Sequence, residues 1–235
     1  MSMYMSKYTL ISRTSFFLIL VFFQCLLFEP KLKTVPDAYV REEVMNEEQK
    51  NAVKVLKQKI VALNTEITAL KKVSEVNAQT LKISKTKIIR HAATRDLLSE
   101  KEKLSLIKDD SVNAKRYLDE SQTADLEKAK EETRLQAWTQ KQTEDSAFLQ
   151  MKEATQSELI AELELVRAEI AVKYQEFQGK TSKDPDYVEK QKYDLQYNSR
   201  KAETRKKTAD WERIKNTATK LPKVNLEDTY LDDTK

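Results

Sequence analysis

The chain has 235 residues, of which 34% are charged and 40% are hydrophobic, and it contains one glycine and four prolines. Tight turns, bulges and phosphate-binding loops depend on glycine, so this composition excludes most β architectures and glycine-rich nucleotide sites and favours long helices. The 42 basic and 38 acidic residues leave a net charge of +4, which indicates a solvated surface of mixed sign rather than a strong field of one sign.

The first predicted element is a hydrophobic segment, residues 16–28, which contains no charge and follows Lys7 and Arg13. Basic residues ahead of a short apolar run are typical of a secretory signal peptide, and roughly 13 residues are few for a membrane span. No small-x-small cleavage site follows the run, so an uncleaved membrane anchor stays open as an interpretation, and an organelle presequence is the third. We therefore expect the secretory pathway, membrane-anchored or luminal and secreted, with a mitochondrial or other organelle membrane as the alternative.

Residues 29–36 form a predicted extended linker, because Pro30 and Pro36 disfavour helix before them. Helix is expected from Asp37 onward. Apolar residues then alternate at spacings of three and four, which is the heptad pattern of a coiled coil: Val53, Leu56, Ile60, Leu63, Ile67 and Leu70. A stripe this narrow requires a facing helix from the same chain or from another. Beyond Leu70 the pattern weakens, and we expect it to continue through Leu81, Ile88, Leu97, Leu104 and Ile107.

A change of pattern near residues 108–111 separates two long helical stretches. Asp and Ser are favoured N-cap residues, so we favour a turn here, with one unbroken helix as the competing interpretation. The flanking stretches, 37–107 and 112–178, are each about 70 residues long, or roughly 100 Å as helix. Matched lengths of this kind predict an antiparallel hairpin.

The second stretch repeats every eleven residues rather than every seven. The repeat consists of Leu126, Ala137, Phe148, Leu159 and Ile170, and of Trp138, Leu149, Ile160 and Ala171 one position later. An eleven-residue period predicts a nearly straight seam, which conflicts with the heptads of the first stretch.

A third, shorter helix is expected over residues 184–221. Gly179 fits the position just after the preceding helix, Asp184 and Pro185 fit the start of the next, and Pro222 ends it. Its second half is basic and offers a face to an anionic lipid, a phosphate or an acidic protein through Arg205, Lys206, Lys207 and Arg213. Residues 222–235 form an acidic tail.

Catalytic and metal constellations are not apparent in the sequence. His91 is the only histidine, and Cys25, the only cysteine, lies in the hydrophobic segment. A nucleophile–base pair or a metal site needs more such residues than these. We therefore expect neither an enzyme nor a cofactor or metal, and nucleic acid is not an expected partner.

The sequence predicts an all-α fold, an elongated coiled-coil rod made of a long antiparallel helical hairpin and a shorter third helix, preceded by an N-terminal hydrophobic helix. We expect a structural interaction protein: a membrane-targeted scaffold, spacer or subunit of a larger assembly, which oligomerises with itself or with other helical chains. A secreted helical packing protein after signal cleavage and a peripheral-stalk-like subunit of a membrane complex are the alternatives. A module whose basic third helix binds anionic lipid or nucleic acid is a further one, in which nucleic acid is the less expected ligand.

Overall fold

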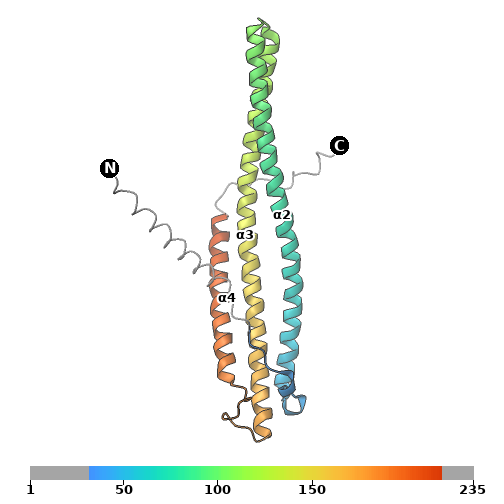
Figure 1. The fold of residues 1–235 in the computed structure, drawn as a ribbon, viewed down its shortest axis with the longest axis vertical. Helices are drawn as coiled ribbons and strands as arrows, with labels where there is room; N and C mark the ends of the chain where they lie inside the picture. The colour runs from blue at the N-terminus through green and yellow to red at the C-terminus, as the bar shows by residue number, and fades with distance from the viewer. Residues whose placement is uncertain (1–31, 219–235) are drawn as a thin grey trace, which may run out of the picture. The chain divides into compact units, whose positions relative to one another are not determined.

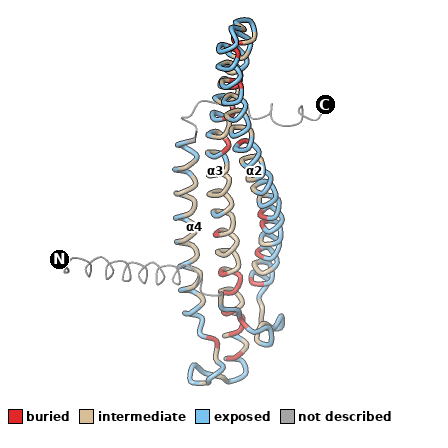
Figure 2. Tube along the Cα trace, turned by 45° about the horizontal axis from the view of Figure 1, so that its top comes forward, coloured by how far each residue is buried: buried red, intermediate tan, exposed pale blue. Residues whose placement is uncertain are grey.

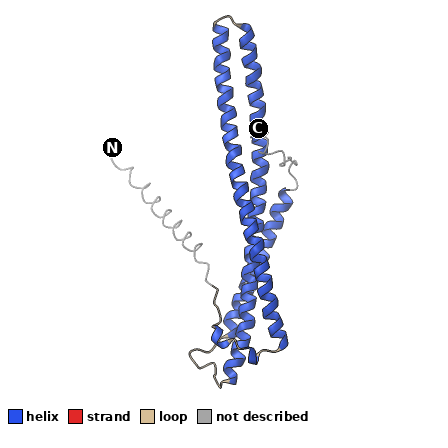
Figure 3. Cartoon of the chain, turned by 90° about the vertical axis from the view of Figure 1, so that its right-hand side faces the viewer, coloured by secondary structure: helices blue, strands red, loops and turns tan. Residues whose placement is uncertain are grey.

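The computed structural model describes residues 32–218. The chain divides into two compact units, Met1–Thr34 and Val35–Lys235, and the predicted hydrophobic helix and acidic tail lie outside the described residues. Within the second unit, the described residues form three α-helices: α2 (Glu47–Ile107), α3 (Ser111–Phe177) and α4 (Lys190–Ala218). Two short 3-10 turns, η1 (Asp37–Tyr39) and η2 (Glu42–Val44), come before them. No strand occurs between residues 32 and 218, so the all-helical prediction is confirmed for this part of the chain (Figure 3).

The helices α2 and α3 form an antiparallel hairpin. Their cross-helix contacts are symmetric about the turn at Asp109: Lys173 contacts Gln49 near the open end, and the Asn77 side chain donates to Asp145 midway, at 2.7 Å. Nearer the turn, Arg95 pairs with Asp125. The helix α4 packs along the half of α3 that lies away from the turn (Figure 1). The described residues 35–218 therefore form a helical bundle in which α3 is the central helix.

The turn between α2 and α3 is built without glycine. Asp109 adopts the left-handed conformation, with φ of 55°. The N–H groups of Asp109 and Asp110 donate to the carbonyls of Leu106 and Ser105, which satisfies the last carbonyls of α2. The Asp110 carboxylate then caps α3 by accepting from the Asn113 N–H at 3.1 Å. The predicted break near residues 108–111 is confirmed.

The helix α2 begins ten residues later than the sequence predicts, at Glu47 instead of Asp37. Asn46 and Gln49 form a capping box, in which each side chain accepts from the other's backbone N–H. The residues between Pro36 and Asn46 instead form the two 3-10 turns, which pack against α3. The capping box fixes the helix start because it satisfies N–H groups that have no partner within the helix.

A continuous heptad lies along the face of α2 that packs on α3. Buried or half-buried residues recur every seven positions over the whole helix (Figure 2): Gln49, Leu56, Leu63, Leu70, Asn77, Ser84, His91, Leu98 and Ser105. The prediction that Leu97, Leu104 and Ile107 continue the seam is wrong, because these side chains are 56%, 55% and 78% exposed. The heptad keeps its register through polar residues, which the apolar pattern alone does not reveal.

The eleven-residue repeat of α3 does not describe one packing face. Toward α2, buried residues recur every seven positions at Ala124, Glu131 and Trp138. A second buried series, also with a seven-residue spacing, lies on the side of α4: Ala154, Ala161, Ala168 and Gln175. Both helices of the hairpin thus share a heptad period, and the expected mismatch with α2 is absent from the described hairpin.

The connection from α3 to α4 also differs from the prediction. Gly179 has φ of 77° and follows the end of α3, as predicted. However, α4 begins at Lys190 and not at Pro185. The intervening residues are held in turns instead, because the Asp184 carboxylate accepts from the Thr181 N–H and the Val188 N–H donates to the side chain of Gln175.

Charge alternates between the three packed helices. The helix α2 contains 13 Lys or Arg and 7 Asp or Glu residues, and α4 contains 9 and 4. The central α3 has the opposite excess, 14 acidic residues against 9 basic ones. Interhelical ion pairs follow this pattern, for example Lys71–Glu153 at 2.9 Å and Lys190–Glu169 at 2.8 Å. The acidic central helix therefore attracts both neighbours, although exposed pairs of this type each contribute little.

Candidate functional site: a clamped N-terminal segment and two uncovered helix faces

The first candidate site is a clamp on α3 that holds the segment at Val35. The Val35 N–H donates to the buried Glu164 carboxylate at 2.6 Å, and its carbonyl accepts from Arg167 at 2.8 Å. Arg167 also pairs with Asp37. The Val35 side chain is only 2% exposed and packs in an apolar cluster with Ala168, Ala171 and Val188.

A polar network around Asp186 holds the N-terminal segment at a second point, Tyr39. The Asp186 carboxylate accepts from the Tyr39 hydroxyl at 2.8 Å and from the Lys180 ammonium. The hydrogen bond from Lys180 contributes most to lowering the pKa of Asp186, and the hydrogen bond from Tyr39 lowers it further. In turn, the hydrogen bond to Asp186 raises the pKa of Tyr39. Fully buried Gln175 links the Asp186 carbonyl to the Val188 N–H. The segment that follows the predicted membrane-targeting region is thus fixed by backbone, ionic and apolar contacts together.

A second candidate site is an uncovered heptad stripe on α2, called here the α2 outer stripe: Val76, Ile83, Leu97 and Leu104. These residues recur at multiples of seven, one position before the residues that face α3, and all are exposed. The same heptad position holds Val55, Ala62 and Ala69 in the first half of the helix. Its neighbours on the surface include the uncharged residues Gln79, Thr80, Thr86, Ala93 and Thr94, together with several charged residues. Apolar residues in a sustained heptad are typical of helix–helix contacts.

The third candidate site is the distal α3 face, which continues the surface of α3 used by α4. Trp211 of α4 stacks on Phe148, with ring centroids 5.1 Å apart, and Lys207 donates to Gln150. The described part of α4 ends at Ala218, and the corresponding α3 residues nearer the hairpin turn are exposed. They are Lys115, Leu118, Asp119, Gln122, Asp125, Leu126, Ala129, Glu132, Thr133 and Gln136.

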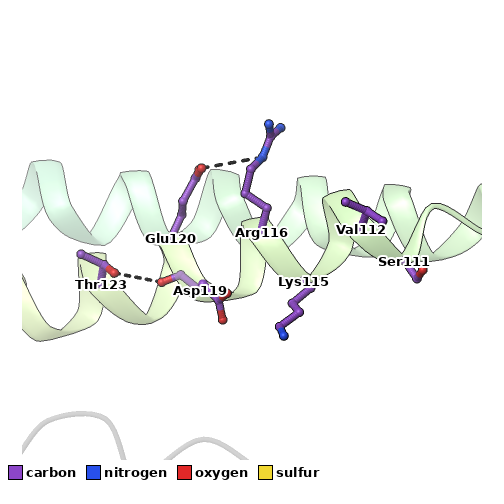
Figure 4. A pocket seen from close by; sticks show the side chains of 7 residues that line it. All are labelled: Ser111, Val112, Lys115, Arg116, Asp119, Glu120 and Thr123. Carbon is purple, nitrogen blue, oxygen red and sulfur yellow. Dashed lines mark hydrogen bonds and ion pairs between the residues drawn. The ribbon is translucent and has the colours of Figure 1, made fainter.

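One end of the distal α3 face forms a shallow hollow near the start of the helix. Its lining residues all belong to α3 and include Val112, Lys115 and Asp119 (Figure 4). Arg116 and Glu120 also line it and form an ion pair at 3.8 Å. A hollow lined by one helix has no opposing walls to enclose a small molecule, so its shape suits contact with another helix.

The residues predicted as helix seam are divided among several surfaces. Leu56, Leu63 and Ile67 are buried and Val53, Ile60 and Leu70 half-buried on the seam of α2. On α3, Trp138 and Ile170 are buried, while Leu149, Leu159 and Ile160 are half-buried. Phe148 contacts α4, and Leu126, predicted to lie in the same seam, is 64% exposed on the distal α3 face.

The four residues predicted to bind an anionic partner do not form one uniform cluster. Arg205 and Lys206 are exposed on α4. Lys207 instead donates to Gln150, and Arg213 lies 3.6 Å from Asp210. Only Lys207 of the four is therefore engaged with another helix, because Arg213 pairs within α4 and stays exposed.

Sequence reasoning missed the clamp and the α2 outer stripe. The clamp depends on a contact between residues 129 positions apart, which no local pattern indicates. The stripe forms a second heptad in the sequence, one position before the heptad that faces α3. The sequence prediction places Leu97 and Leu104 of this stripe in the seam that faces α3.

Searches for similar proteins give no guide to the activity of these sites. No family model, no curated protein and no solved structure matches the chain. Between residues 32 and 218, no group of three or more His, Cys, Asp or Glu side chains is arranged to hold a metal ion. None of the helices in that range is long and apolar enough to cross a membrane.

Proposed function

We propose that the chain is a structural interaction protein, a membrane-targeted coiled-coil scaffold that joins other helical chains. The observation that carries this proposal is the α2 outer stripe. A helix that packs on one partner needs one apolar face, whereas α2 has a second heptad of large apolar residues that nothing in the described chain covers. Keeping Ile83, Leu97 and Leu104 exposed to water is unfavourable, so a further helix is the expected cover.

The clamp supports the membrane-targeted part of the proposal. Residues 16–28 have the composition of a signal peptide or anchor, and the chain that follows them is fixed to α3 at Val35. Because the chain is held on α3 from Val35 onward, only residues 29–34 separate the hydrophobic segment from this attachment point in the sequence. If the segment is removed in the cell, the same bundle would act as a secreted or luminal packing protein.

Cross-linking of the native protein tests the proposal. The full chain would be cross-linked through its lysines in a membrane fraction from its natural source and analysed by mass spectrometry, together with the mass of the mature protein. We expect Lys72 and Lys101, which flank the α2 outer stripe, to link to a helical segment of another polypeptide or another copy. Links confined to pairs within one chain would contradict a scaffold function. The mature mass decides between an anchored and a processed form.

A further inference from the structure

The surroundings of the α2 outer stripe indicate which kind of helix would cover it. Arg90 occupies the heptad position between Ile83 and Leu97 and interrupts the stripe with a positive charge. The charged residues beside the stripe are Lys72, Lys87, Glu100 and Lys101, of which all but Glu100 are basic. A covering helix should therefore combine uncharged or apolar residues along its centre with acidic residues at its edges.

The chain itself contains a surface with this chemistry. The distal α3 face has Leu118, Leu126 and Ala129 with uncharged Gln122 and Thr133 along its centre. Its charged residues are Lys115, Asp119, Asp125 and Glu132, three of them acidic. Asp125 already pairs with Arg95 within the hairpin and Glu132 lies 3.6 Å from Lys128, so Asp119 is the acidic residue on this face that has no ion pair with another side chain of the described chain. At 1.5 Å per residue the stripe from Val76 to Leu104 extends roughly 42 Å and the distal α3 face from Lys115 to Gln136 roughly 32 Å, so the α3 face covers about three quarters of the stripe.

We infer that the α2 outer stripe binds the distal α3 face of a second copy of this chain. This inference rests on the proposed scaffold function and names the partner. The basic α2 of one copy then meets the acidic α3 of the next, which repeats between copies the attraction that holds α2 to α3 within each hairpin. Contact between the α2 stripes of two copies is disfavoured, because it would bring like charges together.

The proposed interface joins two different surfaces of the molecule. Each copy therefore keeps one unused surface after the first contact, and association continues beyond a pair unless the geometry closes a ring. We expect a series of oligomers whose size grows with protein concentration.

Sedimentation velocity of the full chain in a mild detergent tests the inference. The unmodified chain should associate in a concentration-dependent manner, and the double substitution Ile83→Glu with Leu97→Glu should weaken association by about tenfold or more. The matched control is Val61→Glu with Ile89→Glu, because these residues are also exposed on α2 but lie outside the stripe. The control should associate like the unmodified chain. Equal loss of association in both variants would overturn the inference, because any exposed apolar residue of α2, and not the stripe in particular, would then cause the association.

Charge reversal identifies the α3 partner. Lys72→Glu with Arg90→Glu makes the stripe acidic, and Asp119→Lys with Glu132→Lys makes the distal α3 face basic. Each variant alone should associate poorly, whereas a mixture of the two should form complexes that contain both. A mixture that stays unassociated would overturn the pairing, and circular dichroism of each variant would confirm that the helices are intact.

A strictly monomeric unmodified chain would also overturn the inference, and native cross-links from Lys72 to an unrelated protein would then still support the scaffold function.

Discussion

The buried carboxylate of Glu164 accepts a hydrogen bond from the backbone N–H of Val35, which lies 129 positions earlier in the chain. Glu164 also lies 3.3 Å from Arg167, and Arg167 binds the Val35 carbonyl. One charged pair on α3 therefore satisfies both backbone groups of a buried residue. Buried charges are costly unless they are paired and hydrogen-bonded, and here the N-terminal segment provides part of that compensation.

Removing the carboxylate should destabilise the bundle and release the segment. In Glu164→Ala, Arg167 loses one of its two carboxylate partners and keeps Asp37, while the Val35 N–H loses its acceptor, which should cost about 2–4 kcal/mol of unfolding free energy. Denaturant unfolding would measure the loss, and limited trypsin digestion at Lys33 and Arg41 should become faster. Glu162→Ala, on the half-exposed side of the same helix turn, is the control and should change stability little. Equal digestion rates in both variants would refute the clamp.

The attachment of Tyr39 should depend on pH through Asp186. The pKa of Asp186 is lowered by the hydrogen bonds from Lys180 and Tyr39. The stabilisation of the folded state by the Asp186 carboxylate is therefore complete above the ordinary carboxyl pKa, about 3.9. It is lost as pH falls through the lower pKa of the folded state. Hydrogen exchange of the backbone near Tyr39 should therefore show constant protection at neutral pH. In acid, protection near Tyr39 should fall more than protection in the helices of the bundle.

Asp186→Asn provides the control for the acid effect. This variant keeps a hydrogen-bonding oxygen but has no carboxylate to protonate, so its local protection should be weaker at neutral pH and insensitive to acid. At the alkaline end, the pKa of Tyr39 is raised by its bond to Asp186, so the contact persists up to the ordinary tyrosine pKa of about 10 and is lost above it. Acid sensitivity that remained in Asp186→Asn would assign it to another group.

The sequence predicts the helices of the hairpin and the position of its turn, because these depend on local patterns. Asp110 and Gly179 have the chemistry of a helix cap and a helix end, and the structure uses both. For the second half of the α2 seam the prediction is wrong at Leu97 and Leu104, since polar residues including Asn77, Ser84 and Ser105 occupy the buried positions. A seam position filled by a polar residue resembles a surface position until its partner on the other helix is known.

The N-terminal clamp and the late start of α4 have a similar explanation. Pro185 is compatible with a helix start, but the Asp184 carboxylate accepts from Thr181 and the Val188 N–H donates to Gln175 of α3. Asp186 also accepts from Tyr39, 147 positions earlier in the chain. These contacts outweigh the local preference for helix, which is weak because helix formation depends largely on tertiary packing.

The contact between Asn77 and Asp145 should fix the register of the hairpin. The Asn77 amide donates to the carboxylate at 2.7 Å, and Asp145 also lies 3.5 Å from Lys141. A double-mutant cycle with Asn77→Ala and Asp145→Ala should give a coupling of about 1–2 kcal/mol, because a hydrogen bond to a charged group is stronger than a neutral one. Thermal unfolding of the four proteins measures it.

A charge-free replacement separates stability from register. Asn77→Leu with Asp145→Leu should unfold at a higher temperature than the unmodified chain, because two leucines pack in the seam without desolvating a carboxylate. If the polar pair specifies the alignment, cysteine cross-links between α2 and α3 in this variant should form at more than one register. Cross-links at a single register in both proteins would show that other contacts, such as Ser84 with Glu131, suffice.

The hairpin turn stores backbone strain at Asp109, whose φ of 55° is unfavourable for residues with a side chain. Asp109→Gly should stabilise the chain by up to about 1 kcal/mol, because glycine adopts this conformation without a steric penalty, partly offset by its greater freedom in the unfolded chain. Asp109→Val should instead destabilise it by about 1–2 kcal/mol, since branched side chains disfavour positive φ most. Denaturant unfolding of the pair gives the sign directly. Gly and Val variants of equal stability would mean that the turn opens in solution at no cost, and that the antiparallel pairing of α2 with α3 depends on the helix contacts alone.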